Sequence, residues 1–202
     1  MKMVRFALFA FLPTIMMSLA LSARATIYVF DANLDGVSEA PPNASPATGF
    51  AQVTFDNVAN TMNVDVSFSG LLGTTTASHI HAATASPGTG SAGVATTTPY
   101  FAGFPLGVTS GSYNNTLDMT QASSYNPSYI TANGGTTATA EAALLSAMLA
   151  DEAYLNIHST VFPGGEISGF LILQVPEPGV VFITALGALI PLISRRRRAS
   201  AN

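Results

Sequence analysis

The sequence predicts an all-β domain, an antiparallel β-sandwich of Greek-key type with one short helix. Three observations lead to this class. About seven short segments are rich in β-branched and aromatic residues, and most of them alternate apolar with polar side chains. Loops rich in Gly, Pro, Asn and Ser separate them. Only one stretch has the composition of a helix, so helix packing cannot supply the core.

The first strands are predicted over residues 26–32, 50–56 and 61–69. Residues 26–32 contain Ile, Tyr, Val and Phe, which favour strands. The next two segments alternate apolar and polar residues and are joined by a short Asn-rich turn, which is typical of a hairpin. In the third segment one face is entirely apolar and carries Met62, Val64, Val66 and Phe68. A fourth strand is predicted over residues 76–82.

The second half of the chain continues the pattern with one interruption. Strands are predicted, the first of them weakly, over residues 106–113, 153–159 and 167–175. Residues 126–137 read as a loop or a short helical turn. Residues 139–153 consist of strong helix formers, with Thr137 or Thr139 as the N-cap, and this helix is expected to cross between sheet layers.

The N-terminus has the three parts of a secretory signal peptide. A basic start precedes a long apolar run, and small residues at Ala23 and Ala25 end it. Cleavage is therefore predicted after Ala25, which makes residues 1–25 the signal peptide. The alternative interpretation is an uncleaved N-terminal membrane anchor.

The C-terminus, residues 175–202, carries a second targeting pattern. A Val-Pro-Glu-Pro motif precedes an apolar stretch over 179–194, which is roughly 24 Å long as a helix and can insert by thinning a ~30 Å bilayer core. Four arginines follow and are expected to stay on the cytoplasmic side as a membrane stop. The motif residues are Val175, Pro176, Glu177 and Pro178, and the arginines are Arg195, Arg196, Arg197 and Arg198.

In this arrangement the tail resembles the PEP-CTERM sorting signal of Gram-negative bacteria. The resemblance implies export, a transmembrane helix over 179–194 before processing, recognition by an exosortase-type membrane enzyme, and removal of the tail.

The segment between the two ends has a one-sided charge. Residues 26–174 contain no Lys or Arg, so nothing there can neutralise nucleic-acid phosphates, and nucleic acid is excluded as a partner. Such a domain attracts cations, although its acids also serve simply to keep it soluble. The chain has no Cys, which excludes disulfides and thiolate metal sites. The acids are Asp31, Asp35, Glu39, Asp56, Asp65, Asp118, Glu141, Asp151, Glu152 and Glu166.

The three histidines of the chain form the candidate site. His79 and His81 are two residues apart in a predicted strand, so both imidazoles leave the same face. His158 lies in another predicted strand and can face them, and Glu166 follows a short turn later. Three imidazole nitrogens suit Zn²⁺ or Cu²⁺. The Glu166 carboxylate would be the fourth ligand, or it would accept a hydrogen bond from one of the rings and so fix its tautomer. The alternative is a structural His–Glu network without metal.

Two other kinds of site are weaker. Ser78 is adjacent to His79 but points to the opposite face of the strand, and no nucleophile-elbow pattern is present, which disfavours a hydrolase. Asp31, Asp35 and Glu39 carry the oxygen ligands of a Ca²⁺ site, but the EF-hand pattern is absent and a turn stabilised by Asx hydrogen bonds explains them equally.

Three segments, residues 34–51, 70–83 and 153–171, together resemble the CHRD domain, a module named from the animal protein chordin. The histidine motifs and the run from Gly164 to Ile167 follow the order of that family, and the family's acidic residue and prolines match Glu39, Pro41 and Pro42. One departure is Ser168, where the family usually has Arg; if that Arg pairs with an acid such as Glu39 or Glu166, its partner is free here. The resemblance implies an immunoglobulin-like β-sandwich over 26–174, an extracellular setting and no established catalytic activity.

Two functions follow as expectations. The first is a non-catalytic exported module that is handled by the secretion machinery and the sorting enzyme and is anchored in the membrane until processing. It then acts at the cell surface or outside the cell. Its role there is surface or matrix association, with exopolysaccharide or a surface protein as partner. The second is an extracellular metalloprotein that binds Zn or Cu through its histidines and is redox-active if the metal is copper.

Overall fold

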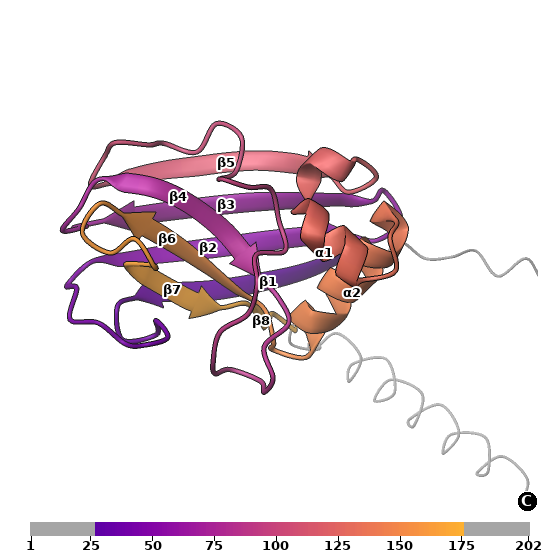
Figure 1. The fold of residues 1–202 in the computed structure, drawn as a ribbon, viewed down its shortest axis with the longest axis horizontal. Helices are drawn as coiled ribbons and strands as arrows, with labels where there is room; N and C mark the ends of the chain where they lie inside the picture. Colours follow the sequence, from indigo (N-terminus) through magenta and orange to yellow (C-terminus); the bar gives the residue numbers. More distant parts are fainter. Residues whose placement is uncertain (1–26, 176–202) are drawn as a thin grey trace, which may run out of the picture.

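The computed structural model describes residues 27–175 as one antiparallel sheet with two helices at one end (Figure 1). The strand order along the sheet is β4-β6-β7-β1-β2-β3-β5, and β8 pairs with β1 beside β7. The strands are β1 (Ile27–Asp35), β2 (Thr48–Asp56), β3 (Thr61–Ser69), β4 (Thr75–His81), β5 (Gly111–Asp118), β6 (Tyr154–Ser159), β7 (Ile167–Phe170) and β8 (Ile172–Leu173).

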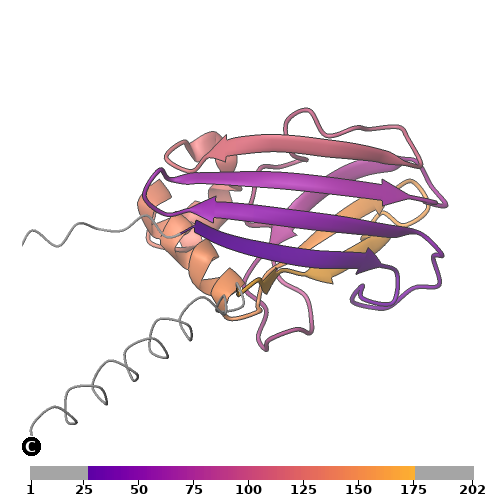
Figure 2. The ribbon, with the colours of Figure 1, turned by 180° about the vertical axis from the view of Figure 1, so that it is seen from behind.

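Four long strands, β1, β2, β3 and β5, form one arm of the sheet, which Figure 2 shows from behind. Their registers are continuous, from Ile27 opposite Asp56 to Asp35 opposite Thr48 in the first pair. Along β3 the side chains at alternate positions are buried, as the sequence predicts. The other face of this arm is largely exposed, so the arm has one core face and one solvent face.

The second arm consists of β4, β6 and β7, and it crosses in front of the first arm in Figure 1. Strand β1 connects the two arms because it pairs on both edges. One edge pairs with β2. The other edge pairs with β7, where Asp35 lies opposite Ser168, and with β8. The strands are antiparallel, as predicted. The prediction of two separate sandwich sheets was wrong in its connectivity, since hydrogen bonding runs through a single curled sheet. Alternation along a strand reports which face is buried, but it carries no information on whether two layers share a strand.

The core lies between the two arms. It includes Phe30 from β1, Phe55 from β2, Val64 from β3, Ile80 from β4 and Leu155 from β6, all with no exposed surface. Ile80 and Leu155 are cross-strand partners. The core therefore uses only one face of the second arm and leaves the other face for polar side chains.

The helices are α1 (Pro127–Ala132) and α2 (Thr137–Leu149), preceded by a short 3₁₀ turn η1 (Ala122–Ser124). They connect β5, at one end of the sheet, with β6 in the other arm, which is the crossover that the sequence predicts. The α2 N-cap is Thr136, whose side chain forms a capping box with Thr139, so the predicted cap is displaced by one residue from Thr137. None of the helices between residues 27 and 175 is long and apolar enough to cross a membrane.

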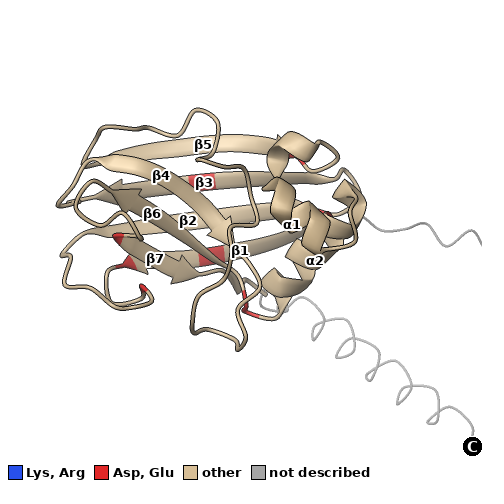
Figure 3. Ribbon diagram, in the orientation of Figure 1, with Lys and Arg blue, Asp and Glu red and all other residues tan. Residues whose placement is uncertain are grey.

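Two predicted strands differ from the structure. The weak strand predicted at 106–113 lies further along the chain, as β5, because residues 106–110 are irregular and the strand begins only at Gly111. The last predicted strand is divided into β7 and β8 at Leu171, whose N–H donates to the Ala153 carbonyl. Acidic side chains are scattered over the fold, and its described part contains no Lys or Arg (Figure 3).

The predicted targeting segments at both ends lie outside the described residues. The signal peptide with Ala23 and Ala25, the apolar stretch 179–194 and the four arginines therefore stay predictions. Of the sorting motif, the structure describes only Val175, which is exposed.

Candidate metal centre

The pairing of β4 with β6 brings the three histidines to one face. His79 lies opposite Asn156, and His81 lies opposite Tyr154. His158 is two residues beyond Asn156, so it extends the same face of β6. Because Ile80 and the odd-numbered β6 residues fill the core on the opposite face, these polar side chains point away from the core.

The three imidazole rings contact one another. The ring centroids of His79 and His158 are 5.1 Å apart, those of His79 and His81 are 5.7 Å apart, and those of His81 and His158 are 6.4 Å apart. One ring nitrogen from each side chain lies within 4.8 Å of one from each of the others. Among residues 27–175 this is the only group of three or more potential metal ligands that converges in this way.

The other ring nitrogens are held by backbone carbonyls of two connections, the long one between β4 and β5 and the turn between β6 and β7. A carbonyl oxygen can only accept, so each ring nitrogen facing one carries its hydrogen, and the lone pair stays on the remaining nitrogen. The lone pairs are thus assigned to Nδ1 of His79, Nε2 of His81 and Nε2 of His158. The bonds are His79 Nε2–H to Pro99 O at 2.6 Å, His81 Nδ1–H to Ala92 O at 2.8 Å, and His158 Nδ1–H to Pro163 O at 2.8 Å.

Two of the three lone pairs have no partner. His79 Nδ1 and His158 Nε2 are buried and make no hydrogen bond. A buried polar nitrogen without a partner is costly in free energy, so two adjacent ones indicate a missing electron-pair acceptor. A metal cation is such an acceptor, and donation from the second ring nitrogen to a carbonyl is the usual support of a metal-bound histidine.

Burial keeps the rings neutral. Burial, with a smaller contribution from the two neighbouring histidines, lowers the pKa of His79 to about 4 against the opposing effect of the Pro99 carbonyl. Burial likewise lowers the pKa of His81 and of His158. All three rings are therefore unprotonated at neutral pH, as metal ligands must be.

Asn156 is a member of the site that the sequence reasoning missed. Its side chain is 2 % exposed, and its Oδ1 lies 3.2 Å from Nε2 of His81. When the His81 Nδ1–H donates to the Ala92 carbonyl, Nε2 of His81 carries a lone pair and therefore faces the Asn156 oxygen as a second acceptor. A cation between the two atoms removes this repulsion. The opposite orientation of the Asn156 amide, which turns its NH₂ group toward the ring, removes it as well. Its position two residues before His158 on a strand was the available signal.

Tyr154 completes this face. Its ring stacks on His81 at a centroid distance of 4.8 Å and an angle of 5°, and it also packs against Phe170 of β7. The main-chain N–H of Ala92 donates to the Tyr154 hydroxyl at 3.4 Å. The tyrosine therefore orients both the His81 ring and the loop that holds it.

Glu166 lies apart from the histidines, and its prediction as the fourth ligand is not supported by its surroundings. The carboxylate accepts from the Ser45 hydroxyl at 2.7 Å and from the backbone N–H groups of Leu72 and Gly73. It also receives a hydrogen bond from Ser159, which faces the core side of β6. Since Glu166 precedes β7, strand alternation does not fix its direction, and it binds neighbouring loops instead of the rings.

The other predicted oxygen ligands are also dispersed. The Asp31 carboxylate accepts from the side chain of Gln52, and the Asp35 carboxylate accepts from the Ser38 N–H in a turn, which agrees with the Asx interpretation. Ser78 is fully buried on the core face, where its hydroxyl donates to the Asn156 carbonyl at 2.8 Å. A nucleophilic role for Ser78 finds no support in this position.

Comparison with known proteins gives one match. The family model described as the CHRD domain matches residues 30–171, which run from within β1 to the end of β7 and contain all three histidines. No curated protein and no solved structure matches the chain.

Proposed function

The chain belongs to the CHRD domain family, and from this premise we propose that it is an exported β domain that binds a Zn²⁺ or Cu²⁺ ion through His79, His81 and His158. The observation that carries the proposal is the convergence of three imidazoles, each with its other ring nitrogen bound to a backbone carbonyl.

The ligand set restricts the metal. Three neutral nitrogens suit Zn²⁺ and Cu²⁺, whereas Ca²⁺ and Mg²⁺ prefer oxygen. Asn156 is the nearest additional donor, and its amide oxygen is a weak one. A three-histidine set leaves a coordination position for water or another ligand, and with copper the same site supports one-electron chemistry.

Metal content of the full-length protein tests the proposal. After dialysis against metal-free buffer, the protein is titrated with Zn²⁺ and Cu²⁺ and analysed for bound metal. We expect one ion per chain, and loss of that ion in His79→Gln, His81→Gln and His158→Gln. Retention of circular-dichroism signal and of cooperative unfolding shows that each variant is folded.

A matched variant sharpens the result. Glu166→Gln alters the predicted ligand that lies elsewhere. It is expected to bind metal like the wild type. Absence of stoichiometric metal from the wild type, together with reduced stability of the histidine variants, supports the structural network in place of the metal centre.

The cellular localisation of the protein is part of the proposal. The family match, the N-terminal pattern and the PEP-CTERM-like tail support an exported protein that is membrane-anchored until an exosortase-type enzyme processes it. The same features, with a domain that lacks Lys and Arg, support the non-catalytic role in surface or exopolysaccharide association. A metal centre is compatible with that role, because metal ligation can stabilise a domain without catalysis.

A further inference from the structure

Glu39 is a buried carboxylate that the metal centre does not use. Its side chain is only 8 % exposed, yet Oε1 has no hydrogen-bond partner. A buried carboxylate oxygen without a donor is among the more costly groups in a fold. Its presence calls for a ligand or a compensating charge.

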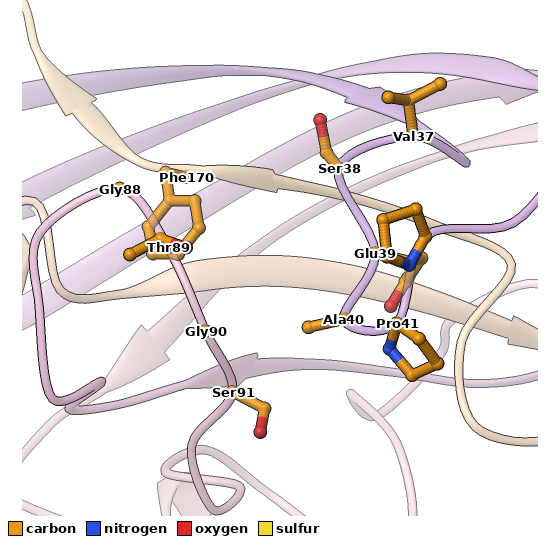
Figure 4. Close-up of a pocket in the computed structure, with 11 residues that line it drawn as sticks. Val37, Ser38, Glu39, Ala40, Pro41, Gly88, Thr89, Gly90, Ser91 and Phe170 are labelled. Carbon is orange, nitrogen blue, oxygen red and sulfur yellow. The ribbon is translucent and has the colours of Figure 1, made fainter.

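Glu39 is one of the residues that line a cleft of about 540 Å³. Figure 4 shows the segment from Val37 to Pro42 on one side of this cleft, with the segment from Gly88 to Ser91 and the ring of Phe170 on the other. The walls are apolar at Phe170 and at the prolines and carry the hydroxyls of the serines. The cleft thus combines one acidic group with apolar surface.

The position of Glu39 is fixed by its surroundings. The N–H groups of Glu39 and Asn43 both donate to the Gly36 carbonyl, and Asp35 accepts from the Ser38 N–H. On the other side the carboxylate lies so close to Gly165 that a Cβ atom there would come within 2.6 Å of its oxygens. The carboxylate is therefore held in place before any ligand arrives.

The domain offers no counter-ion to this carboxylate. Residues 27–175 contain no Lys or Arg, and the three histidines are neutral at pH 7. Burial raises the pKa of Glu39 to about 7, against the opposing effects of the Ser168 side chain and the Ala40 N–H. A bound cation is the partner that restores the ionised form.

We propose that this cleft binds an organic cation, a guanidinium or ammonium group on a short apolar stem, with Glu39 as its counter-ion. The charged group pairs with the Glu39 carboxylate, whose buried Oε1 has no hydrogen-bond partner, and a guanidinium can pair with both oxygens of a carboxylate. The stem packs on the prolines and on the face of Phe170, where a nearby cation is also favoured. Anionic ligands are excluded because the cleft contains no positive group.

Calorimetric titration of the full-length protein with n-butylguanidinium tests this proposal, with n-butylurea as the neutral ligand of the same shape. We expect one guanidinium to bind per chain and the urea to bind at least about tenfold more weakly. Glu39→Gln, which retains the shape of the side chain, is expected to lose about the same factor. Asp65→Asn makes the same charge change on the exposed face of β3 and is expected to bind like the wild type.

A capped tripeptide, Gly-Arg-Gly, distinguishes two sources of the cation. Tighter binding of the tripeptide assigns the site to an arginine of another protein, and tighter binding of n-butylguanidinium assigns it to a free small molecule; both support the proposal. Equal affinity for the guanidinium and the urea overturns it, and so does unchanged binding by a folded Glu39→Gln protein. Absence of binding by every cation overturns it as well.

Discussion

At the scale of single residues, ring tautomers decide what the histidine cluster can bind. The carbonyls of Ala92 and Pro99 lie in the long connection between β4 and β5, and that of Pro163 lies in the turn between β6 and β7; each fixes the hydrogen of one ring. The shared face of His79 and His81 was predictable from strand periodicity alone. The carbonyl partners were not, because the conformations of long loops are set by tertiary contacts and not by local pattern.

Replacement of Asn156 by Asp tests the fourth side chain of the site. An anionic oxygen beside three neutral nitrogens strengthens the attraction for a divalent cation, and without metal it is a buried charge that destabilises the fold. Asn156→Asp is therefore expected to lower the melting temperature of the metal-free protein and to increase the rise caused by Zn²⁺. Asn57→Asp in an exposed turn is the control. Identical Zn²⁺-induced shifts in the two variants would contradict the assignment.

The raised pKa of Glu39 gives a pH-dependent stability. Below about pH 4.5 the side chain is protonated in the folded and unfolded chains, and between pH 4.5 and about 7 only the unfolded chain is ionised. The unfolded chain thus binds fewer protons in this window, so this group makes the wild type less stable as the pH rises. Glu39→Gln lacks the effect and is expected to gain stability relative to wild type, on the order of 3 kcal/mol between pH 4.5 and 8.

Urea unfolding of both proteins at a series of pH values measures that difference. The histidines are common to both proteins, so their contribution to the pH dependence cancels in the comparison. If the difference in unfolding free energy between the two proteins is the same at every pH, the pKa of Glu39 is not raised by folding.

At the scale of elements, the turn between β6 and β7 links the metal centre to the cleft. Its Pro163 carbonyl holds His158, and its Gly165 contacts the Glu39 carboxylate. The sequence predicted this turn from its Pro-Gly-Gly run, and the antiparallel pairing of the two strands is confirmed. It did not predict the contact with Glu39, which is more than a hundred residues away in the chain.

The two glycines of this turn provide a matched pair of substitutions. Gly165 has φ +134°, and an added Cβ would meet the Glu39 carboxylate, whereas a Cβ at Gly164 meets nothing within 4 Å. Gly165→Ala is therefore expected to destabilise the fold by about 1–3 kcal/mol. Gly164→Ala is expected to change stability by less than about 0.5 kcal/mol. Chemical unfolding measures both, and equal effects would show that the close approach of Glu39 is not maintained in solution.

The strands show where sequence reasoning ends. The alternation of Met62, Val64, Val66 and Phe68 predicted β3 and its buried face. It could not predict that β1 pairs on both edges and joins the two arms, because edge pairing is a property of the whole sheet. The direction of Glu166 could not be predicted for a related reason, since this residue precedes β7 and strand alternation does not apply to it.

At the scale of the whole molecule, charge is divided sharply along the chain. All the Lys and Arg side chains belong to the two predicted targeting segments, and the domain between them is acidic. An acidic domain with a neutral imidazole cluster attracts cations. Both proposed sites, the metal centre and the Glu39 cleft, bind positively charged ligands.

Removal of residues 175–202 tests the proposed localisation. The full-length protein is expected in the membrane and surface fractions of an exporting Gram-negative cell that contains an exosortase, and the truncated protein in the soluble exported fraction. Immunoblotting of each fraction measures the distribution. If both forms distribute alike, the tail has no sorting role.

X-ray absorption at the zinc edge of the Zn²⁺-loaded full-length protein identifies the atoms bound to the metal. We expect three imidazole nitrogens at about 2.0–2.1 Å from the zinc, and loss of this coordination in His158→Gln. A shell of oxygens alone, or a spectrum unchanged by that substitution, would contradict the three-histidine metal centre.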